Sequence, residues 1–288
     1  MNNQMELWLE SSTDKMNLNS LEDGIFLEPK LEGLTGLPDI RTTSGVNAGY
    51  DGGWTSAQNF DARSIAIRGN IAKDNAADLE TTRRRLATLV GQGKKETLKL
   101  SFTTQAGNVY TVFVRTISCE MALTRVLNFQ PFLLQFRADD PLIYDDGASG
   151  GTEATLRVQQ LMGGFQIDFE LPLAIGGGAD VTYITNSGSE TVYPVIKFTG
   201  PLHSPTVVNR TTNQQFQIIV DILSTDTIIV DSQLRTATLN GTDIYHLIKP
   251  GSQFITIAPG SNGMVLTSET TSDTGIAEVS FKQGYISI

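Results

Sequence analysis

The sequence predicts a mainly β protein of two domains, with a single helix among the strands of the first. Three observations lead to this fold class. Only one segment combines helical periodicity with capping residues at both ends. Short strands separated by turns follow one another at intervals of roughly ten residues through the second half. The chain has 288 residues and 40% apolar content, enough for a core in each of two domains.

The helix is predicted within residues 73–95, KDNAADLETTRRRLATLVGQGKK. Asp74 or Asn75 can cap its N-terminus, and Gly91 with Gly93 ends it before two lysines. The apolar residues that return to one face are Leu79, Leu86, Leu89 and Val90. Such spacing is typical of a helix packed by one side onto a core.

Strands make up the rest of the first domain. ETLKLSFT and VYTVFVRTI alternate in polarity, and the short, glycine-containing loop TQAGN between them predicts a hairpin. The segment RVLNFQPFLLQFRADDP predicts another long strand. Its Pro131 lacks an amide proton, so this residue is expected at an edge or a bulge.

A linker is predicted at residues 145–151, DDGASGG, because small and flexible residues cannot anchor a core. We therefore expect one domain over 1–146 and another over 147–288. The second reads as an all-β sandwich or jelly roll. Within it, TIAPGSNGMVLTS at 256–268 holds Pro259-Gly260 and Asn262-Gly263, two turn dipeptides that predict a sharp reversal of the chain.

Charge and cysteine content narrow the function classes. The net charge of −10 opposes binding to a phosphate backbone, and the single cysteine, Cys119, excludes an internal disulfide and a four-cysteine zinc site. Three adjacent arginines, Arg83, Arg84 and Arg85, form the one basic patch. They spread around the helix and lack interleaved aromatic residues, which favours a solvated face or an inter-subunit ion pair over nucleic-acid binding.

The residues needed for catalysis are sparse. His203 and His246 lie far apart and outside any metal-binding motif. The adjacent carboxylates, Asp139-Asp140 and Asp145-Asp146, suit turns and caps better than a glycosidase pair. The glycine run AIGGGAD fits no phosphate-binding pattern. We therefore predict no catalytic, cofactor-binding or metal-binding residues and no cofactor.

The sequence contains no apolar run long enough to span a membrane, and its first residues do not resemble a signal peptide. We expect a soluble protein made in the cytoplasm. Tyr183, Tyr193, Tyr245 and Tyr285 could stack on sugar rings if they shared one face of the sandwich, although tyrosine is also ordinary in strands.

Several stretches, in their order and spacing, resemble phage distal tail proteins of long non-contractile tails. The first is FLEPKLEGLTGLPDIRTTSGVNAGYDGGWTSAQNFDARSIAIRGNI. It is followed by LETTRRRLATLV and FQPFLLQFRADDPLIYDD, and later by ITNSGSETVYPVIKFTGPLHSPTVVN and ITIAPGSNGMVL. The resemblance runs from about Leu27 to Leu266.

The resemblance implies a β-barrel-like first domain with one helix, which assembles into a hexameric ring, and a second, galectin-like β-sandwich domain. It further implies partners at both ends of the ring: the tail tube protein, and a tail-associated tip or fibre protein together with a receptor-binding protein or cell-surface glycan. The implied location is the tail tip of a virion. No family-wide catalytic residue is carried over.

Three function classes stay open at this stage: a structural tail hub, a carbohydrate-binding module that adheres to a bacterial surface, and a hydrolase whose site is not visible. For the hub we expect Arg83, Arg84 or Arg85 to contact an acidic surface of the neighbouring subunit. Particle mass separates a closed ring from a lone binding module.

Overall fold

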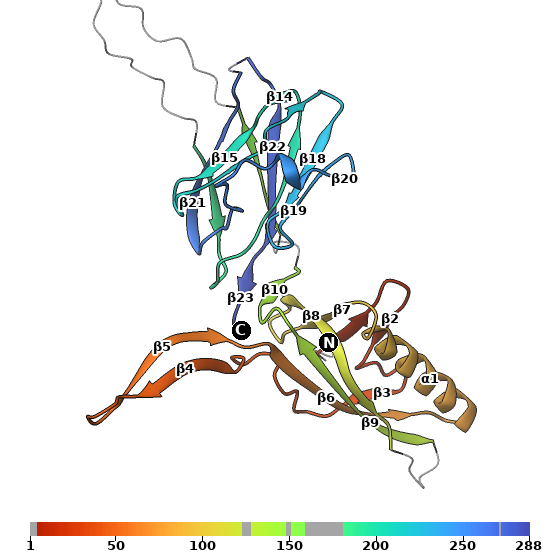
Figure 1. Ribbon diagram of the computed structural model, residues 1–288. Coiled ribbons are helices and arrows are strands. Elements are labelled where there is room, and N and C mark those ends of the chain that lie inside the picture. The colour runs from red at the N-terminus through yellow and green to blue at the C-terminus, as the bar shows by residue number, and fades with distance from the viewer. Residues whose placement is uncertain (1–4, 123–127, 148–150, 159–180, 271) are drawn as a thin grey trace, which may run out of the picture. The chain divides into compact units, whose positions relative to one another are not determined.

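The computed structural model describes residues 5–122, 128–147, 151–158, 181–270 and 272–288. The chain forms two compact units, shown in Figure 1. Unit 1 comprises Met1–Gly147 together with Tyr285–Ile288, and unit 2 comprises Ala148–Gly284. The strand pattern of the sequence gives no sign that the last residues join unit 1.

Unit 1 is a curled, barrel-like sheet with one helix. Its elements in chain order are β1 (Leu7–Glu10), β2 (Lys15–Asn17), β3 (Ile25–Leu27), β4 (Ile40–Val46), β5 (Gly53–Phe60), β6 (Arg63–Ala72), α1 (Ala76–Gln92), β7 (Leu98–Thr103), β8 (Val109–Glu120), β9 (Phe129–Ala138) and β10 (Ile143–Asp145). The strand order is β2-β1-β7-β8-β9-β6-β3, with β10 paired to β8 and to β23 (Gly284–Tyr285). Alternate side chains of these strands are buried, and together they form one continuous core.

The predicted helix is confirmed as α1. The side chain of Asn75 accepts a hydrogen bond from the amide of Asp78 at 2.8 Å, and Gly93 follows the last turn. Leu86, Leu89 and Val90 are buried, and the Thr116 hydroxyl of β8 donates to the Val90 carbonyl at 2.6 Å. This bond joins the end of the helix to the sheet.

The predicted hairpin of β7 and β8 is also confirmed, with Leu98 paired to Val114 and Thr103 to Val109. In β9, Pro131 pairs with Asn70 of β6 on one side. On its other side, the pairing of β8 with β9 ends at Leu133, so Pro131 lies beyond the ladder in which its missing amide proton would be needed.

Unit 2 is a β-sandwich, as the sequence predicts. Its elements are β11 (Gly151–Arg157), β12 (Thr182–Asn186), β13 (Val195–Thr199), β14 (Leu202–His203), β15 (Thr206–Asn209), β16 (Gln214–Gln217), β17 (Asp221–Ile222), β18 (Thr227–Asp231), β19 (Thr236–Leu239), β20 (Thr242–Asp243), the 3-10 turn η1 (Tyr245–Leu247), β21 (Gly260–Thr267) and β22 (Ile276–Lys282). One sheet has the order β11-β22-β13-β18-β19-β20, and the other β12-β21-β15-β16. Asn240 and Gly241, both with positive φ, form the two-residue turn between β19 and β20.

One turn prediction is wrong. Asn262 and Gly263 lie within β21, paired with Ile184 and Tyr183, so only Pro259-Gly260 marks a change of direction. Asn262 is fully buried and uses its side chain instead, donating to the carbonyls of Ala258 and Gly260 at 2.7 and 3.1 Å. The amide side chain thus holds the preceding turn in place from inside a strand. Two predicted features lie outside the described residues: GFQIDFELPLAI at 164–175, one of the short strands expected in the second half, and the glycine run AIGGGAD.

A buried arginine joins distant parts of unit 1. Arg63 is 1% exposed at the start of β6. Its guanidinium donates to the carbonyls of Gly33 and Gly36 at 3.0 and 2.6 Å, and of Ile286 at 2.6 Å. Two further bonds reach the Pro141 carbonyl at 3.0 and 2.9 Å. Burial lowers the pKa of Arg63, and its acceptors within the described chain are all main-chain carbonyls.

We predict that Arg63→Met strongly destabilises unit 1, because it leaves buried carbonyls without donors. The expected loss is about 3 kcal/mol or more of unfolding free energy. Both tryptophans, Trp8 and Trp54, belong to unit 1, so urea unfolding followed by tryptophan fluorescence reports on this unit.

The matched control is Arg68→Met in the same strand, where the side chain is 43% exposed and pairs with Glu32. Its effect should stay within about 1 kcal/mol. An Arg63 variant with the same urea midpoint as the control would contradict the structural role assigned to the guanidinium.

Candidate assembly surface

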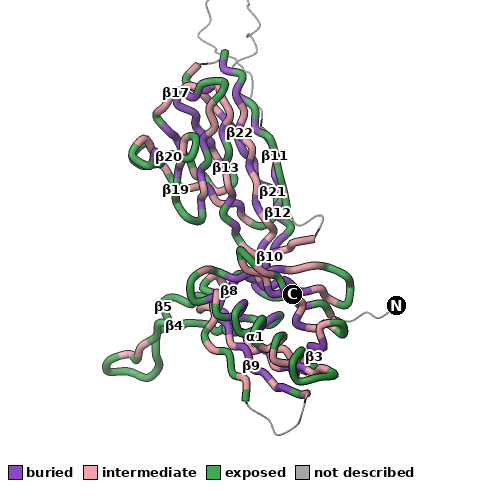
Figure 2. The backbone as a smooth tube through the Cα atoms, turned by 90° about the vertical axis from the view of Figure 1, so that its right-hand side faces the viewer, coloured by how far each residue is buried: buried purple, intermediate pink, exposed green. Residues whose placement is uncertain are grey.

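The most exposed element of unit 1 is a two-stranded arm, defined here as residues 40–60. Its strands β4 and β5 pair with each other and with no other described strand. Every residue of β5 is exposed, and in β4 only Gly45 is partly covered. Figure 2 shows the arm as an exposed extension of its unit. A lone two-stranded ribbon is marginally stable in water, so such an arm gains from being covered.

The composition of the arm differs from that of a protected sheet edge. Natural edge strands are usually guarded by charged side chains, but the only charged residues between 40 and 60 are Arg41 and Asp51. The exposed apolar side chains of the arm are Ile40 (53%), Val46 (86%), Tyr50 (72%), Trp54 (50%) and Phe60 (38%). Apolar groups gathered on an exposed segment are typical of an interaction surface.

The two ends of the arm are firmly held. The Asp61 amide donates to the Asp39 carbonyl at 2.7 Å, closing the base. Arg63 follows directly and binds the carbonyls of Gly33 and Gly36, in the segment that leads into β4. Gly33 has φ +76°, and a Cβ there would meet the Ser64 carbonyl oxygen at 1.8 Å, so only glycine fits.

The three predicted contact arginines all have carboxylate partners within unit 1. Arg83 and Arg84 both bind Glu80, each at 2.9 Å. Arg85 forms two hydrogen bonds with Asp14, at 2.7 and 3.0 Å. Hydrogen bonding from Arg83 lowers the pKa of Glu80, and the bond from Arg85 lowers that of Asp14. Contact with a neighbouring subunit stays a prediction for these residues.

A hollow of about 410 Å³ lies beside two of these arginines, between α1 and β8. The residues that line it are Arg83, Arg84, Ala87, Val90, Gly91, Thr116, Cys119 and Met121. Its floor is largely apolar and its rim is cationic. Partial burial raises the pKa of the Cys119 thiol, although the residue reaches the surface.

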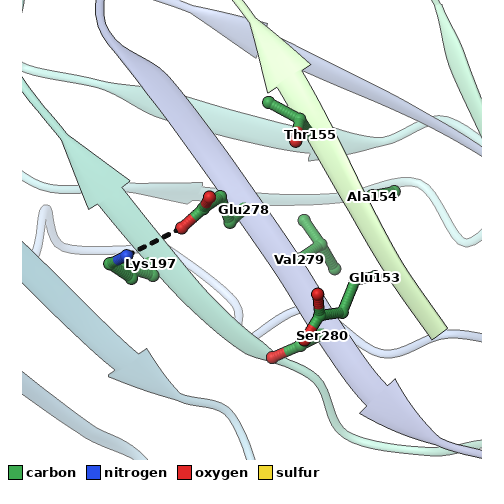
Figure 3. A pocket seen from close by; sticks show the side chains of 7 residues that line it. All are labelled: Glu153, Ala154, Thr155, Lys197, Glu278, Val279 and Ser280. Atoms are coloured by element: carbon green, nitrogen blue, oxygen red, sulfur yellow. Dashed lines mark hydrogen bonds and ion pairs between the residues drawn. The ribbon is translucent and has the colours of Figure 1, made fainter. Parts of the chain in front are cut away.

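Unit 2 has a polar hollow of about 460 Å³ on the outer face of its larger sheet, drawn in Figure 3. Lys197 of β13 binds Glu278 of β22 across it at 2.9 Å. The other lining residues are Glu153, Ala154, Thr155, Val279 and Ser280. These side chains offer hydrogen bonds, but the lining includes no aromatic ring on which a sugar could stack.

The four tyrosines considered for sugar stacking are not brought together at this hollow. Tyr183, Tyr193 and Tyr245 are exposed in unit 2, on β12, before β13 and on η1 respectively. Tyr285 belongs to unit 1, where its ring packs edge-on against Tyr110 with centroids 6.0 Å apart. The hollow therefore lacks the aromatic surface that sequence reasoning considered, and Tyr285 does not contribute to one on unit 2.

The sequence analysis did not identify Asp273, a buried aspartate that contacts His203 and Ser268. Asp273 is 4% exposed, and its carboxylate accepts bonds from the His203 amide at 2.8 Å and from the Ser268 hydroxyl. It also lies 2.8 Å from Nδ1 of His203, whose pKa is raised by this hydrogen bond. Burial opposes ionisation of Asp273, but the bonds from Ser268 and His203 outweigh it and lower its pKa. The Ser268 hydroxyl bonds Asp273 and the main chain of His203, and within the described residues it has no bond to the His203 imidazole. The group is therefore a structural tie and lacks the serine–imidazole bond of a catalytic triad.

No described group of three or more His, Cys, Asp or Glu side chains is arranged to hold a metal ion. No helix in the described part of the chain is long and apolar enough to cross a membrane. Of the adjacent carboxylates, Asp140 accepts from the Leu142 amide, Asp145 from the Gly147 amide, and Asp146 pairs with Lys99 at 2.6 Å. The bonds of Asp140 and Asp145 stabilise turns, as their positions predict, whereas Asp146 instead binds a lysine of β7.

Residues 187–285 match the siphovirus-type tail component, C-terminal domain family. Most of unit 2 therefore resembles a siphovirus-type tail component domain. The predicted resemblance to phage distal tail proteins is thereby confirmed. No curated protein matches the chain.

Solved structures extend this likeness to the fold of both units. The crystal structure of SPP1 Dit, described as a paradigm of the hub adsorption apparatus in phages that infect Gram-positive bacteria, shares 17% identity at a TM-score of 0.67, over 96% of this chain and 99% of that one. A chain of the phage P2 baseplate in its activated conformation with Ca gives 9% identity and a TM-score of 0.54, over 97% and 98%. The same baseplate with Sr gives 10% and 0.52, again over 97% and 98%. The mainly β architecture with one helix is thus a fold found in phage tail proteins.

We predict that His203 stabilises the tail component domain in a pH-dependent manner. Its pKa is raised above the ordinary value of 6.5, so the stabilisation is complete below that pH and is lost as pH rises through the folded-state pKa. His203→Gln should therefore lower the stability of unit 2 more at about pH 6 than at about pH 9. Urea unfolding followed by far-ultraviolet circular dichroism measures the difference.

His246→Gln, in η1, is the matched control, because it also removes an imidazole from unit 2. Equal losses for His203→Gln at the two pH values would show that the imidazole acts only by packing.

Proposed function

We propose that the protein is a structural hub at the tip of a long non-contractile phage tail. In this proposal the copies close into a hexameric ring, which joins the tail tube to the tip and receptor-binding components. The arm is the single observation that carries the ring. It is an almost fully exposed, nearly uncharged ribbon with five exposed apolar side chains, and hydrogen bonds hold its base to its own unit.

A ring of identical copies fits these features better than a two-fold dimer does. A ring uses two different patches, one on each side of every subunit, whereas a two-fold dimer uses one patch twice. A projecting arm can supply one of these two patches. The other patch must be a surface of different shape that receives the arm. The fold similarity to SPP1 Dit supports the same assignment.

The proposal includes no catalytic role. The matched family is a tail component, and the His203 and Asp273 pair is a structural tie. The partners in the virion are the tail tube protein on one side of the ring and a tail-associated tip or fibre protein on the other. A receptor-binding protein or a cell-surface glycan would meet unit 2, whose polar hollow offers hydrogen-bonding groups.

Particle mass tests the ring directly. The chain mass is 31.2 kDa, and native mass spectrometry of the full chain should show a particle of six copies. Replacing residues 40–60 by two glycines should yield monomers, because the Asp61 to Asp39 bond keeps the base closed while the arm is lost.

A control variant tests whether loss of exposed apolar area alone has this effect. It carries serine in place of three exposed apolar residues of unit 2: Leu223 (64% exposed), Leu234 (72%) and Tyr245 (55%). This variant should keep the mass of the wild type. A wild-type chain that stays monomeric at high concentration would refute the ring, and an armless chain that still forms hexamers would place the interface elsewhere.

A further inference from the structure

The arm and the hollow beside α1 lie on opposite sides of unit 1. In Figure 1 the arm leaves the sheet on the left, whereas α1 lies on the right. The tip of an arm therefore cannot reach the hollow of its own subunit. Two different surfaces on opposite sides are what a head-to-tail interface between identical copies requires.

From this arrangement we propose that the tip of the arm, residues 47–52, docks into the hollow between α1 and β8 of the next copy. Tyr50 enters the apolar floor, and Asp51 pairs with Arg84 at the rim. This inference rests on the proposed ring and names the joint that closes it.

The tip is shaped to present these two side chains. The Asn47 amide donates to the Gly52 carbonyl at 3.1 Å and closes the turn. Gly49 and Gly52 have φ of +87° and +103°, conformations that glycine adopts without strain. Tyr50 is 72% exposed at the apex. Asp51 forms no ion pair with any residue that the structure describes, so its carboxylate is available to a partner.

The hollow complements the tip in polarity and charge. Its floor includes Ala87, Val90 and Met121, which suit an aromatic ring. At the rim, Arg83 and Arg84 share the single carboxylate of Glu80, so one positive charge is left over. Arg84 is 77% exposed and can turn toward an incoming acid, and a guanidinium also interacts well with a tyrosine ring.

The chain itself supplies a direct test, because Cys119 lines the hollow and is the only cysteine. In Tyr50→Cys, mild oxidation at alkaline pH should link the tip of each copy to Cys119 of the next. Non-reducing electrophoresis should then show a ladder of linked species up to the hexamer, which collapses to monomer on reduction. The double variant Tyr50→Cys with Cys119→Ser should give no species above a dimer.

Gln58→Cys, at an exposed position near the base of the same arm, is the matched positional control and should form no ladder. If Tyr50→Cys yields the hexameric mass but no ladder, the docking site is wrong although the ring stands. If the wild-type chain forms no ring at all, the proposed function fails first, so the two failures are distinguishable.

Charge reversal tests the same joint without cysteines. Asp51→Arg and Arg84→Asp should each weaken assembly about fivefold per joint at low salt. Combining them should restore it, because the pair is re-formed with opposite orientation. Lys94→Asp reverses the charge of an exposed side chain in the same unit and so controls for the change in net charge. Two single variants that assemble like Lys94→Asp, or a double variant no better than the worse single one, would overturn the pairing.

Discussion

Unit 1 depends on one buried guanidinium. Arg63 connects the segment before the arm, the carbonyl of Pro141 and the last residues of the chain, which are distant in sequence. Within the described residues its acceptors are all main-chain carbonyls, so main-chain dipoles stabilise the charge. Such a group is costly to bury unless every proton is satisfied, and that demand fixes the position of each segment that supplies an acceptor. The Ile288 amide, which donates to the Thr35 carbonyl at 3.2 Å, adds a second link at the same place.

Unit 2 uses buried polar side chains in a similar way. Asn186, Asn209 and Asn262 are at most 1% exposed, and each donates to main-chain carbonyls of the segment 256–260 or of neighbouring loops. Asp273 and Ser268 hold the backbone of His203. In both units, therefore, polar groups with several bonds fix irregular segments where no sheet ladder is available to do so.

Sequence reasoning succeeded where the signal is local. The caps of α1, the hairpin of β7 and β8, and the turn at Asn240-Gly241 each follow from a few adjacent residues. It failed where a side chain meets residues far along the chain. Asn262-Gly263 has the composition of a turn, yet both residues lie in a strand and pair with Ile184 and Tyr183 of β12. The tie between His203 and Asp273 spans 70 residues and leaves no pattern in either neighbourhood.

Of two further features, Arg63 left a signal in the sequence and the arm did not. Arg63 stands in phase with Ile65 and Ile67 in RSIAIRGNI, so the period of two already places it on the buried face. The arm, by contrast, has no buried face, and its strands are rich in Thr, Ser and Gly without the apolar alternation that marks a half-buried strand. Exposure removes the very periodicity by which strands are recognised.

The link between the arm and Arg63 explains why a rigid root matters for the proposed ring. A closed ring forms only if each joint turns the next subunit by the same angle, and a small error repeated at every joint gives an open helix. A ribbon that swung freely at its base could not set that angle, however well its tip docked. With both ends of the arm held by one buried cation and by the Asp61 to Asp39 bond, the direction of the arm is set by the core of unit 1. The weak contacts at the tip therefore need only hold neighbouring subunits together, because the folded core of unit 1 already sets the angle between them.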